Sequence, residues 1–165
     1  MATDFLAYWK PSTVDAQAAA GGPQNHAASG QFGRVQPGDT VWLVTVRGGR
    51  LRLVTSITVG HVTGQAGAAG LLGVPAEDLW EAEYHIVAAV GTGREIAERD
   101  IQHLAPQLRF VSAGGSDRLT LGEDGAVNAQ QLQTMRVLSA SSAELLAGAC
   151  SPDAEPGAAA DGGGM

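Results

Sequence analysis

The chain has very little cysteine, and this shortage excludes two kinds of site. Cys150 is the single cysteine among 165 residues, so no intramolecular disulfide can form. The four histidines have no metal-ligand spacing, and one cysteine cannot complete a zinc site. We therefore expect no metal and no cofactor. His85 falls inside a predicted strand, which favours a structural role for it.

Long apolar runs and leader segments are also missing. No run approaches the roughly 20 residues that span a membrane. The N-terminus lacks the basic region and hydrophobic stretch of a signal peptide. We therefore expect a cytoplasmic protein with no membrane partner.

Basic side chains are scarce as well. Ten Lys and Arg stand against 17 Asp and Glu, which gives a net charge of −7 at pH 7. Three of the acids lie beyond residue 150, so residues 1–150 still carry 14 acidic and 10 basic side chains. Because neutralisation of phosphates supplies most nucleic-acid affinity, the chain has no generally basic binding surface. A nucleic-acid partner would have to be held locally by cations around a pocket, or with help from another domain or subunit.

What is present suits one globular domain. A chain of 165 residues with 44% hydrophobic residues is long enough for one sizeable core. We expect this domain to span residues 1–149. Residues 150–165 consist mainly of Gly, Ala, Pro and acidic residues, a composition that predicts a disordered low-complexity tail.

The first part of the chain predicts a strand followed by helices. The apolar, aromatic segment 5–9 predicts a strand. Ser12 or Thr13 could cap a helix over residues 14–20, and Asn25 could cap a short helix that ends near Phe32. The strongest local pattern follows: two strands, 41–46 and 51–59, joined at a Gly-Gly step, predict a hairpin with a primed turn.

Later segments are less regular. Residues 63–78 form a long connection rich in Gly and Ala, which is typical of functional or disordered loops, and residues 79–90 predict a third long strand. A short helix is expected at 98–104, a brief strand at 108–111 and a helix capped by Asn128 at 129–136, and Ser141 with Glu144 predicts the cap of a last helix. Together these patterns predict an α+β fold with a twisted or closed mixed β-sheet flanked by short helices.

Aromatic residues make up only 5% of the chain but lie beside strands and turns. Trp42 lies within the hairpin and is expected to belong to the core. Trp9 and Trp80 adjoin loops, so each could belong to the core or line a pocket. An aromatic ring beside a loop suits stacking on an exposed base, which contributes about 1–3 kcal/mol. Lys10, followed by Ser12 and Thr13, adds a cation and hydroxyl groups nearby, although a capping role explains the hydroxyls equally well.

At these residues the sequence resembles the EVE domain, a member of the PUA-like superfamily that includes YTH, ASCH and SRA-type domains. The resemblance rests on the segments 8–13, on 25–28 with Phe32 and the turn at Gly38 and Asp39, and on 78–82. It covers residues 4–147 and is greatest to EVE-like modules of modification-dependent HNH restriction systems. His26 stands where the family usually has an aromatic residue, and the chain has no HNH motif.

The resemblance implies that the protein binds DNA and holds a flipped modified base, most of all methylcytosine or hydroxymethylcytosine, in an aromatic pocket. The base-binding residues that it implies are Trp9, Lys10, Ser12, Asn25, His26, Ser29, Leu71, Leu72 and Trp80. Gln131 and Arg136 are expected to contact the nucleic acid. The chain would bind the base without transforming it, and a separate nuclease or effector subunit could act with it.

Two other functions remain open from the sequence. Some ASCH-type relatives hydrolyse an amide on a modified cytidine, and Lys10, Thr13 and either Glu81 or Glu83 could supply base, nucleophile and proton carrier. The chain could also be an RNA-binding module of the same superfamily. The sequence does not decide between DNA and RNA.

Overall fold

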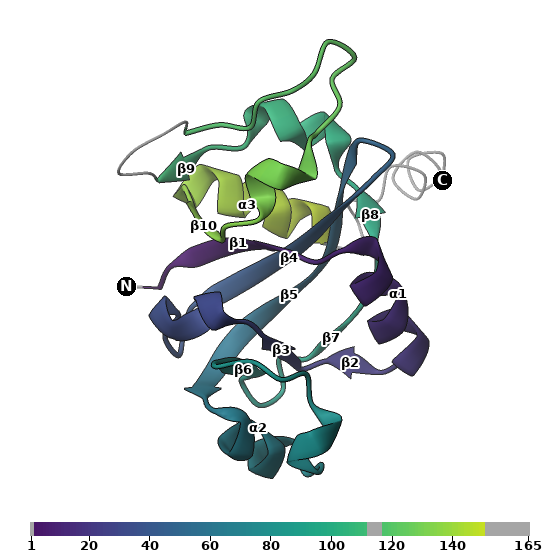
Figure 1. Cartoon of the computed structure of the whole chain (residues 1–165). Coiled ribbons are helices and arrows are strands. Elements are labelled where there is room, and N and C mark those ends of the chain that lie inside the picture. Colours follow the sequence, from purple (N-terminus) through teal and green to yellow (C-terminus); the bar gives the residue numbers. More distant parts are fainter. Residues whose placement is uncertain (1, 112–116, 151–165) are drawn as a thin grey trace, which may run out of the picture.

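The fold is built on a mixed β-sheet. The structure, a computed structural model, describes residues 2–111 and 117–150. Eight strands form the sheet, and the main path runs β3 (His26–Ala28), β6 (His85–Ala88), β5 (Arg50–Thr63), β4 (Thr40–Arg47), β1 (Asp4–Tyr8), β10 (Arg136–Leu138) and β9 (Phe110–Val111). The short strand β8 (Arg99–Asp100) also pairs with β5, and β2 (Pro23–Gln24) pairs with β7 (Arg94–Glu95) as a separate ribbon (Figure 1).

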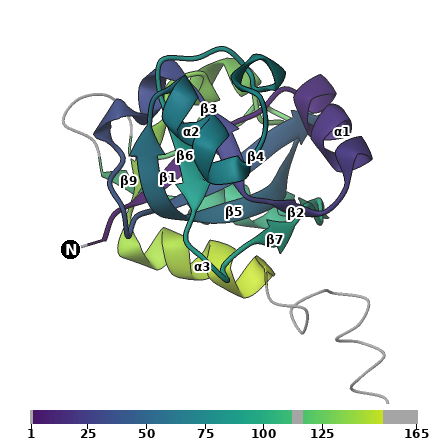
Figure 2. The same cartoon turned by 90° about the horizontal axis from the view of Figure 1, so that it is seen from below.

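Short helices flank this sheet. The α-helices are α1 (Pro11–Ala20), α2 (Gln65–Leu72) and α3 (Ala140–Cys150), and the 3₁₀ helices are Gly30–Arg34, Ala76–Asp78, Gln102–Gln107 and Ala129–Leu132. Figures 1 and 2 show α2 beside β6 and α3 at another side of the molecule, across the long strands. The predicted α+β class with a mixed sheet and short helices is therefore confirmed. Of the two expected forms of the sheet, the described residues adopt the open one, with β3 and β9 as edges.

The β4–β5 hairpin confirms the strongest sequence prediction. Gly48 and Gly49 form its two-residue turn with φ of 57° and 78°, and Arg47 pairs with Arg50 on either side. Positive φ at both central residues is the requirement of a type I′ turn, which glycine meets without steric cost. The hairpin therefore forms from local sequence, and its long strands carry the rest of the sheet.

Strand β5 changes partner along its length. Its first part pairs with β4, and its last residues, from Val59 onward, pair with β6 after a shift in register between Val59 and His61. A Cβ atom at Gly60 would lie 2.7 Å from the Cα of Ala89. Only glycine allows this approach, so Gly60 lets β6 and its edge neighbour β3 join the sheet.

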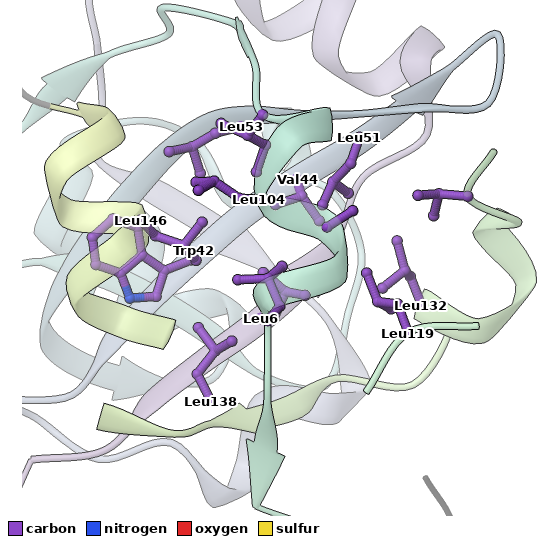
Figure 3. Packing of buried hydrophobic residues seen from close by; sticks show 14 of the residues in the cluster. Leu6, Trp42, Val44, Leu51, Leu53, Leu104, Leu119, Leu132, Leu138 and Leu146 are labelled. Atoms are coloured by element: carbon purple, nitrogen blue, oxygen red, sulfur yellow. The ribbon is translucent and has the colours of Figure 1, made fainter. Parts of the chain in front are cut away.

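The two faces of the central strands contribute to two apolar clusters. Leu6 belongs to the cluster beneath α3, and its neighbours Phe5 and Ala7 belong to the other, as the alternation of a strand requires. Figure 3 shows Trp42 and Leu146 of α3 in the first cluster. Trp42 is only 6% exposed, so its predicted place in the core is confirmed.

Several predicted caps are wrong in the first part of the chain. Helix α1 begins at Pro11, and Lys10 occupies the N-cap position without a side-chain bond, so Ser12 and Thr13 lie inside the first turn. Proline is favoured at this first position because its missing N–H needs no partner there. Asn25 caps no helix. It precedes β3, and Ser29 caps the following 3₁₀ helix by accepting a hydrogen bond from Gln31 N at 3.1 Å.

The predicted third strand is also largely wrong. Only His85–Ala88 forms strand β6, and residues 79–84 precede it without regular structure. The expected loop before it contains α2, in which Ala68 and Ala69 are buried. Small side chains let this short helix approach β6 closely. The helix is therefore stabilised by packing against the sheet, which the Gly- and Ala-rich sequence of the segment does not indicate.

Predictions for the later elements are partly confirmed. Asn128 caps a helix as expected, accepting from Gln130 N at 2.9 Å, but that 3₁₀ helix ends at Leu132 and strand β10 follows. Helix α3 begins at Ala140, and Ser139 rather than Ser141 provides its cap: the Ser139 hydroxyl accepts from Ser142 N at 3.2 Å.

The helix expected at 98–104 is only partly present, because Arg99–Asp100 form strand β8 and a 3₁₀ helix follows over Gln102–Gln107. The strand expected at 108–111 appears as β9. The predicted tail begins at Cys150, which is the last residue of α3, and its remaining residues, 151–165, lie outside the described residues. Among the described helices, none is long and apolar enough to cross a membrane.

Candidate functional site

A cavity of about 180 Å³ lies where β1 runs into α1 and faces β3. Its lining residues are Tyr8, Trp9, Lys10, Thr13, Gln17, His26, Ala27, Ala28 and Trp80. Figure 1 shows α1 leading away from the end of β1 toward β2, with β3 alongside. The structure therefore brings together four of the residues implied by the family resemblance: Trp9, Lys10, His26 and Trp80.

The junction of β1 and α1 positions one wall of this cavity. Trp9 N donates to Val44 O at 2.9 Å, which extends the β1–β4 pairing by one residue and orients the Trp9 side chain. Lys10 O then accepts from Thr13 N at 2.9 Å and opens α1. Because Thr13 and Gln17 are four residues apart, they share one face of α1 and both line the cavity.

Trp80 forms an exposed aromatic edge of the cavity. Its side chain is 76% exposed, whereas that of Trp9 is partly buried. Trp80 lies between the 3₁₀ helix Ala76–Asp78 and β6, outside any strand. An exposed tryptophan stabilises the fold little, because most of its apolar surface still faces water.

His26 and His85 form a hydrogen-bonded pair beside the cavity. Ala28 pairs with His85 across β3 and β6, so His26, two residues earlier, is a diagonal neighbour of His85 on the same face. His26 Nε2 and His85 Nδ1 lie 2.7 Å apart, with the ring planes inclined by 18°. Burial, and then the proximity of His85, lowers the pKa of His26 to about 4. His26 is therefore neutral at pH 7.

Lys10 is the cation of this cavity. Its side chain is exposed, and no carboxylate in residues 2–111 or 117–150 forms an ion pair with it. Its positive charge is thus available to an anionic or electron-rich ligand.

A second hollow of about 110 Å³ adjoins the cavity and shares Tyr8, Trp9 and Ala28 with it. Ser29, another predicted site residue, lines this second hollow. Its hydroxyl accepts from Gln31 N at 3.1 Å. Ser29 therefore lies next to the cavity and holds the following 3₁₀ helix in place.

The predicted wall of Asn25, Leu71 and Leu72 lies elsewhere. These three residues line a separate hollow of about 450 Å³ that shares no lining residue with the cavity. Asn25 O accepts from Ala88 N at 2.8 Å, which fixes this backbone against β6. Ser12, on the exposed side of α1, lines neither hollow. The structure thus divides the predicted pocket into two sites.

The two predicted nucleic-acid contacts already interact with the protein. The Gln131 amide donates to Thr120 O at 2.9 Å and accepts from Thr120 N at 2.8 Å. The Arg136 guanidinium lies 4.0 Å from the centre of the Phe110 ring. Neither residue lines the cavity.

A further hollow of about 530 Å³ lies between β8 and the end of α3 and has a structural explanation. Arg47 Nε donates to Glu98 Oε2 at 2.7 Å, and Arg50 Nε donates to Asp100 Oδ2 at 2.6 Å. These bonds lower the pKa of both carboxyl groups, Glu98 chiefly through Arg47 and Asp100 chiefly through Arg50. The carboxylates that line this hollow are therefore already neutralised by arginines.

Sequence reasoning did not place Tyr8, Gln17, Ala27 or Ala28 at the site, and it did not identify His85 as the partner of His26. The spacing of Thr13 and Gln17 could have indicated their shared helix face. The partnership of two histidines 59 residues apart leaves no such signal in the sequence.

No group of three or more His, Cys, Asp or Glu side chains in the described part of the chain could hold a metal ion. A scan against protein-family models finds no match, and a search of curated proteins finds no similar sequence.

Proposed function

We propose that the protein reads a modified nucleobase: it holds a flipped base in the cavity between Trp9 and Trp80 and leaves it chemically unchanged. The observation that carries this proposal is the cavity itself, which combines an exposed tryptophan, a second partly buried tryptophan and a free cation. A cavity of about 150 Å³ accommodates benzene. A volume of about 180 Å³ therefore suits one substituted six-membered ring.

Energetics supports the same assignment. Extruding a base from a duplex costs a few kcal/mol, which the pocket must offset by stacking and hydrogen bonds to the base edge. Stacking on one aromatic ring contributes about 1–3 kcal/mol. Trp80 offers an exposed face, and Lys10, Thr13 and Gln17 offer polar groups for the edge of the base. DNA carrying methylcytosine or hydroxymethylcytosine remains our favoured ligand.

An amidohydrolase acting on a modified cytidine is the second candidate, because Lys10 and Thr13 line the same cavity. That reaction needs a proton carrier beside them. Glu81 and Glu83, the predicted carriers, are not among the lining residues. The binding function therefore has more support.

One experiment separates these functions. The protein is titrated with matched oligonucleotides that carry one methylcytosine, one cytosine acylated on its amino nitrogen, or neither, as DNA duplex, DNA single strand and RNA, at one salt concentration. Nucleosides from the same mixtures are then analysed by mass spectrometry. Tighter binding of modified DNA with unchanged nucleosides supports the reader, whereas release of an acyl group with turnover supports the hydrolase. Equal affinity for modified and unmodified strands refutes the reader, and preference for RNA moves the ligand class to RNA.

A further inference from the structure

We propose that His85 sets the hydrogen-bonding character of the cavity: it donates its Nδ1–H to His26 Nε2, so that His26 holds its own proton on Nδ1 and offers an N–H donor to the ligand. The part of this inference that concerns the ligand rests on the proposed function. The part that concerns the two rings does not.

The geometry limits the pair to two arrangements. A nitrogen–nitrogen distance of 2.7 Å requires one proton between His26 Nε2 and His85 Nδ1. A neutral imidazole has one donor and one acceptor nitrogen. If His26 donates, its Nδ1 is a bare acceptor and a neutral His85 must hold its proton on Nε2. If His85 donates, His26 must hold its proton on Nδ1, and a neutral His85 leaves Nε2 as a bare acceptor.

The surroundings of His85 decide between these arrangements. His85 is fully buried, and its Nε2 atom has no hydrogen-bond partner among the described residues. In the protein backbone, buried N–H groups without an acceptor are rarer than carbonyl groups without a donor. Placing the proton on His85 Nε2 would create such an orphaned donor. The arrangement in which His85 donates therefore has the lower free energy.

His26 carries this choice to the cavity. His26 is a lining residue of the cavity, and with Nε2 engaged by His85 its Nδ1 is the ring nitrogen that has no partner among the described residues. The Lys10 ammonium, on the same cavity, is also a pure donor. The cavity is thus rich in donors, which suits a base that presents two acceptors, such as the O2 and N3 atoms of a flipped cytosine.

The direct test measures the tautomer of each histidine in the protein without any ligand. Long-range ¹H–¹⁵N NMR correlation at pH 7 distinguishes Nδ1–H from Nε2–H rings, and the variants His26→Gln and His85→Asn assign the signals. We expect the Nδ1–H form for both His26 and His85. The Nε2–H form of His26 overturns the inference.

Two variants at His85 test whether it positions His26. His85→Asn retains an N–H donor near the place of Nδ1, whereas His85→Leu removes it. We expect His85→Asn to keep His26 in the Nδ1–H form, and His85→Leu to release it to a mixture. Chemical denaturation is used to check that each variant is folded under these conditions. An unchanged His26 tautomer in folded His85→Leu overturns the positioning role.

A binding assay is the second part of the test. With methylcytosine DNA as probe, His85→Leu is expected to lose about tenfold in affinity relative to His85→Asn, the typical contribution of one hydrogen bond. Equal affinities overturn the role of His85 in binding. If both tautomers are as expected but neither modified nor unmodified DNA binds the unaltered protein, the proposed function fails and the interaction of the two rings stands.

Discussion

Trp80→Ala separates a binding role from a packing role most sharply. The Trp80 side chain is 76% exposed, so its removal deprives the core of little apolar contact. A change at an exposed position of this kind alters the free energy of unfolding by about 0.5 kcal/mol or less. If the ring stacks on the base, the same change should remove about 1–3 kcal/mol of binding free energy, or about 5- to 150-fold in affinity for modified DNA.

Trp42→Ala is the matched control. Trp42 is 6% exposed, and its indole N–H donates to Asp4 Oδ1 at 3.0 Å. Truncation of a buried tryptophan costs about 3–5 kcal/mol of folding stability, and the loss of its hydrogen bond leaves Asp4 without this donor. Affinity for modified DNA should then fall only as far as less protein is folded.

The assay combines urea denaturation with titration of modified and unmodified duplex at one salt concentration, because the electrostatic part of binding varies with salt. Binding of unmodified duplex depends on phosphate contacts and should change little in Trp80→Ala. The reasoning is refuted if Trp80→Ala retains full discrimination between the two duplexes. It is also refuted if Trp80→Ala loses 3 kcal/mol of stability or more, in the range expected of a buried tryptophan.

Three further predictions concern charge, backbone packing and pH. Lys10→Gln should weaken binding to modified DNA and, if Lys10 contacts a phosphate, reduce the salt dependence of log K by about one unit in a titration series. Gly60→Ala should lower the free energy of unfolding, measured in urea, by about 1–3 kcal/mol, because its Cβ would lie 2.7 Å from the Ala89 Cα. The control Gly70→Ala in α2, where a Cβ meets open space, should raise the free energy of unfolding by about 0.5–1 kcal/mol. Because the pKa of His26 falls from 6.5 to about 4 on folding, the unfolded chain binds more protons between these values, so stability should decline as pH is lowered through this window. We expect this partly exposed ring to account for about 1–2 kcal/mol of the unfolding free energy that is lost between pH 7 and pH 4.5. This share is the loss measured for the unaltered protein minus the loss measured for His26→Gln.

Each of these has an outcome that contradicts it. An unchanged salt slope in Lys10→Gln removes Lys10 from contact with phosphate. Equal stability of the Gly60→Ala and Gly70→Ala variants shows that β6 can move away from Gly60 at no cost. Parallel loss of stability with pH in the unaltered protein and in His26→Gln shows that His26 titrates alike in the folded and unfolded states.

Local patterns were sufficient for the central hairpin and for the place of Trp42. Gly48 and Gly49 specify their turn within two residues, because positive φ at both positions suits glycine. The alternation of the flanking strands then assigns each side chain to a face. Such features were predictable because their causes lie within a few neighbouring residues.

The family resemblance anticipated part of the candidate site. It named Trp9, Lys10, His26 and Trp80, which the structure places around one cavity. It also named Asn25, which lines a different hollow. A short motif identifies residues near a site, but the direction of each side chain depends on which strand the backbone pairs with.

The amino-acid sequence by itself determined the α+β class, the β4–β5 hairpin and the burial of Trp42, since each follows from backbone preferences or from periodicity. Only the tertiary structure decided that Asn25 leads into a strand rather than capping a helix, and that His26 meets His85. Those outcomes require β3, which contains His26, to pair with β6, which contains His85, 59 residues away in the sequence. They also require Gly60, which lets Ala89 approach β5. Pairing between distant segments draws its free energy from burial and hydrogen bonds that exist only once the sheet has assembled, so no local pattern records it.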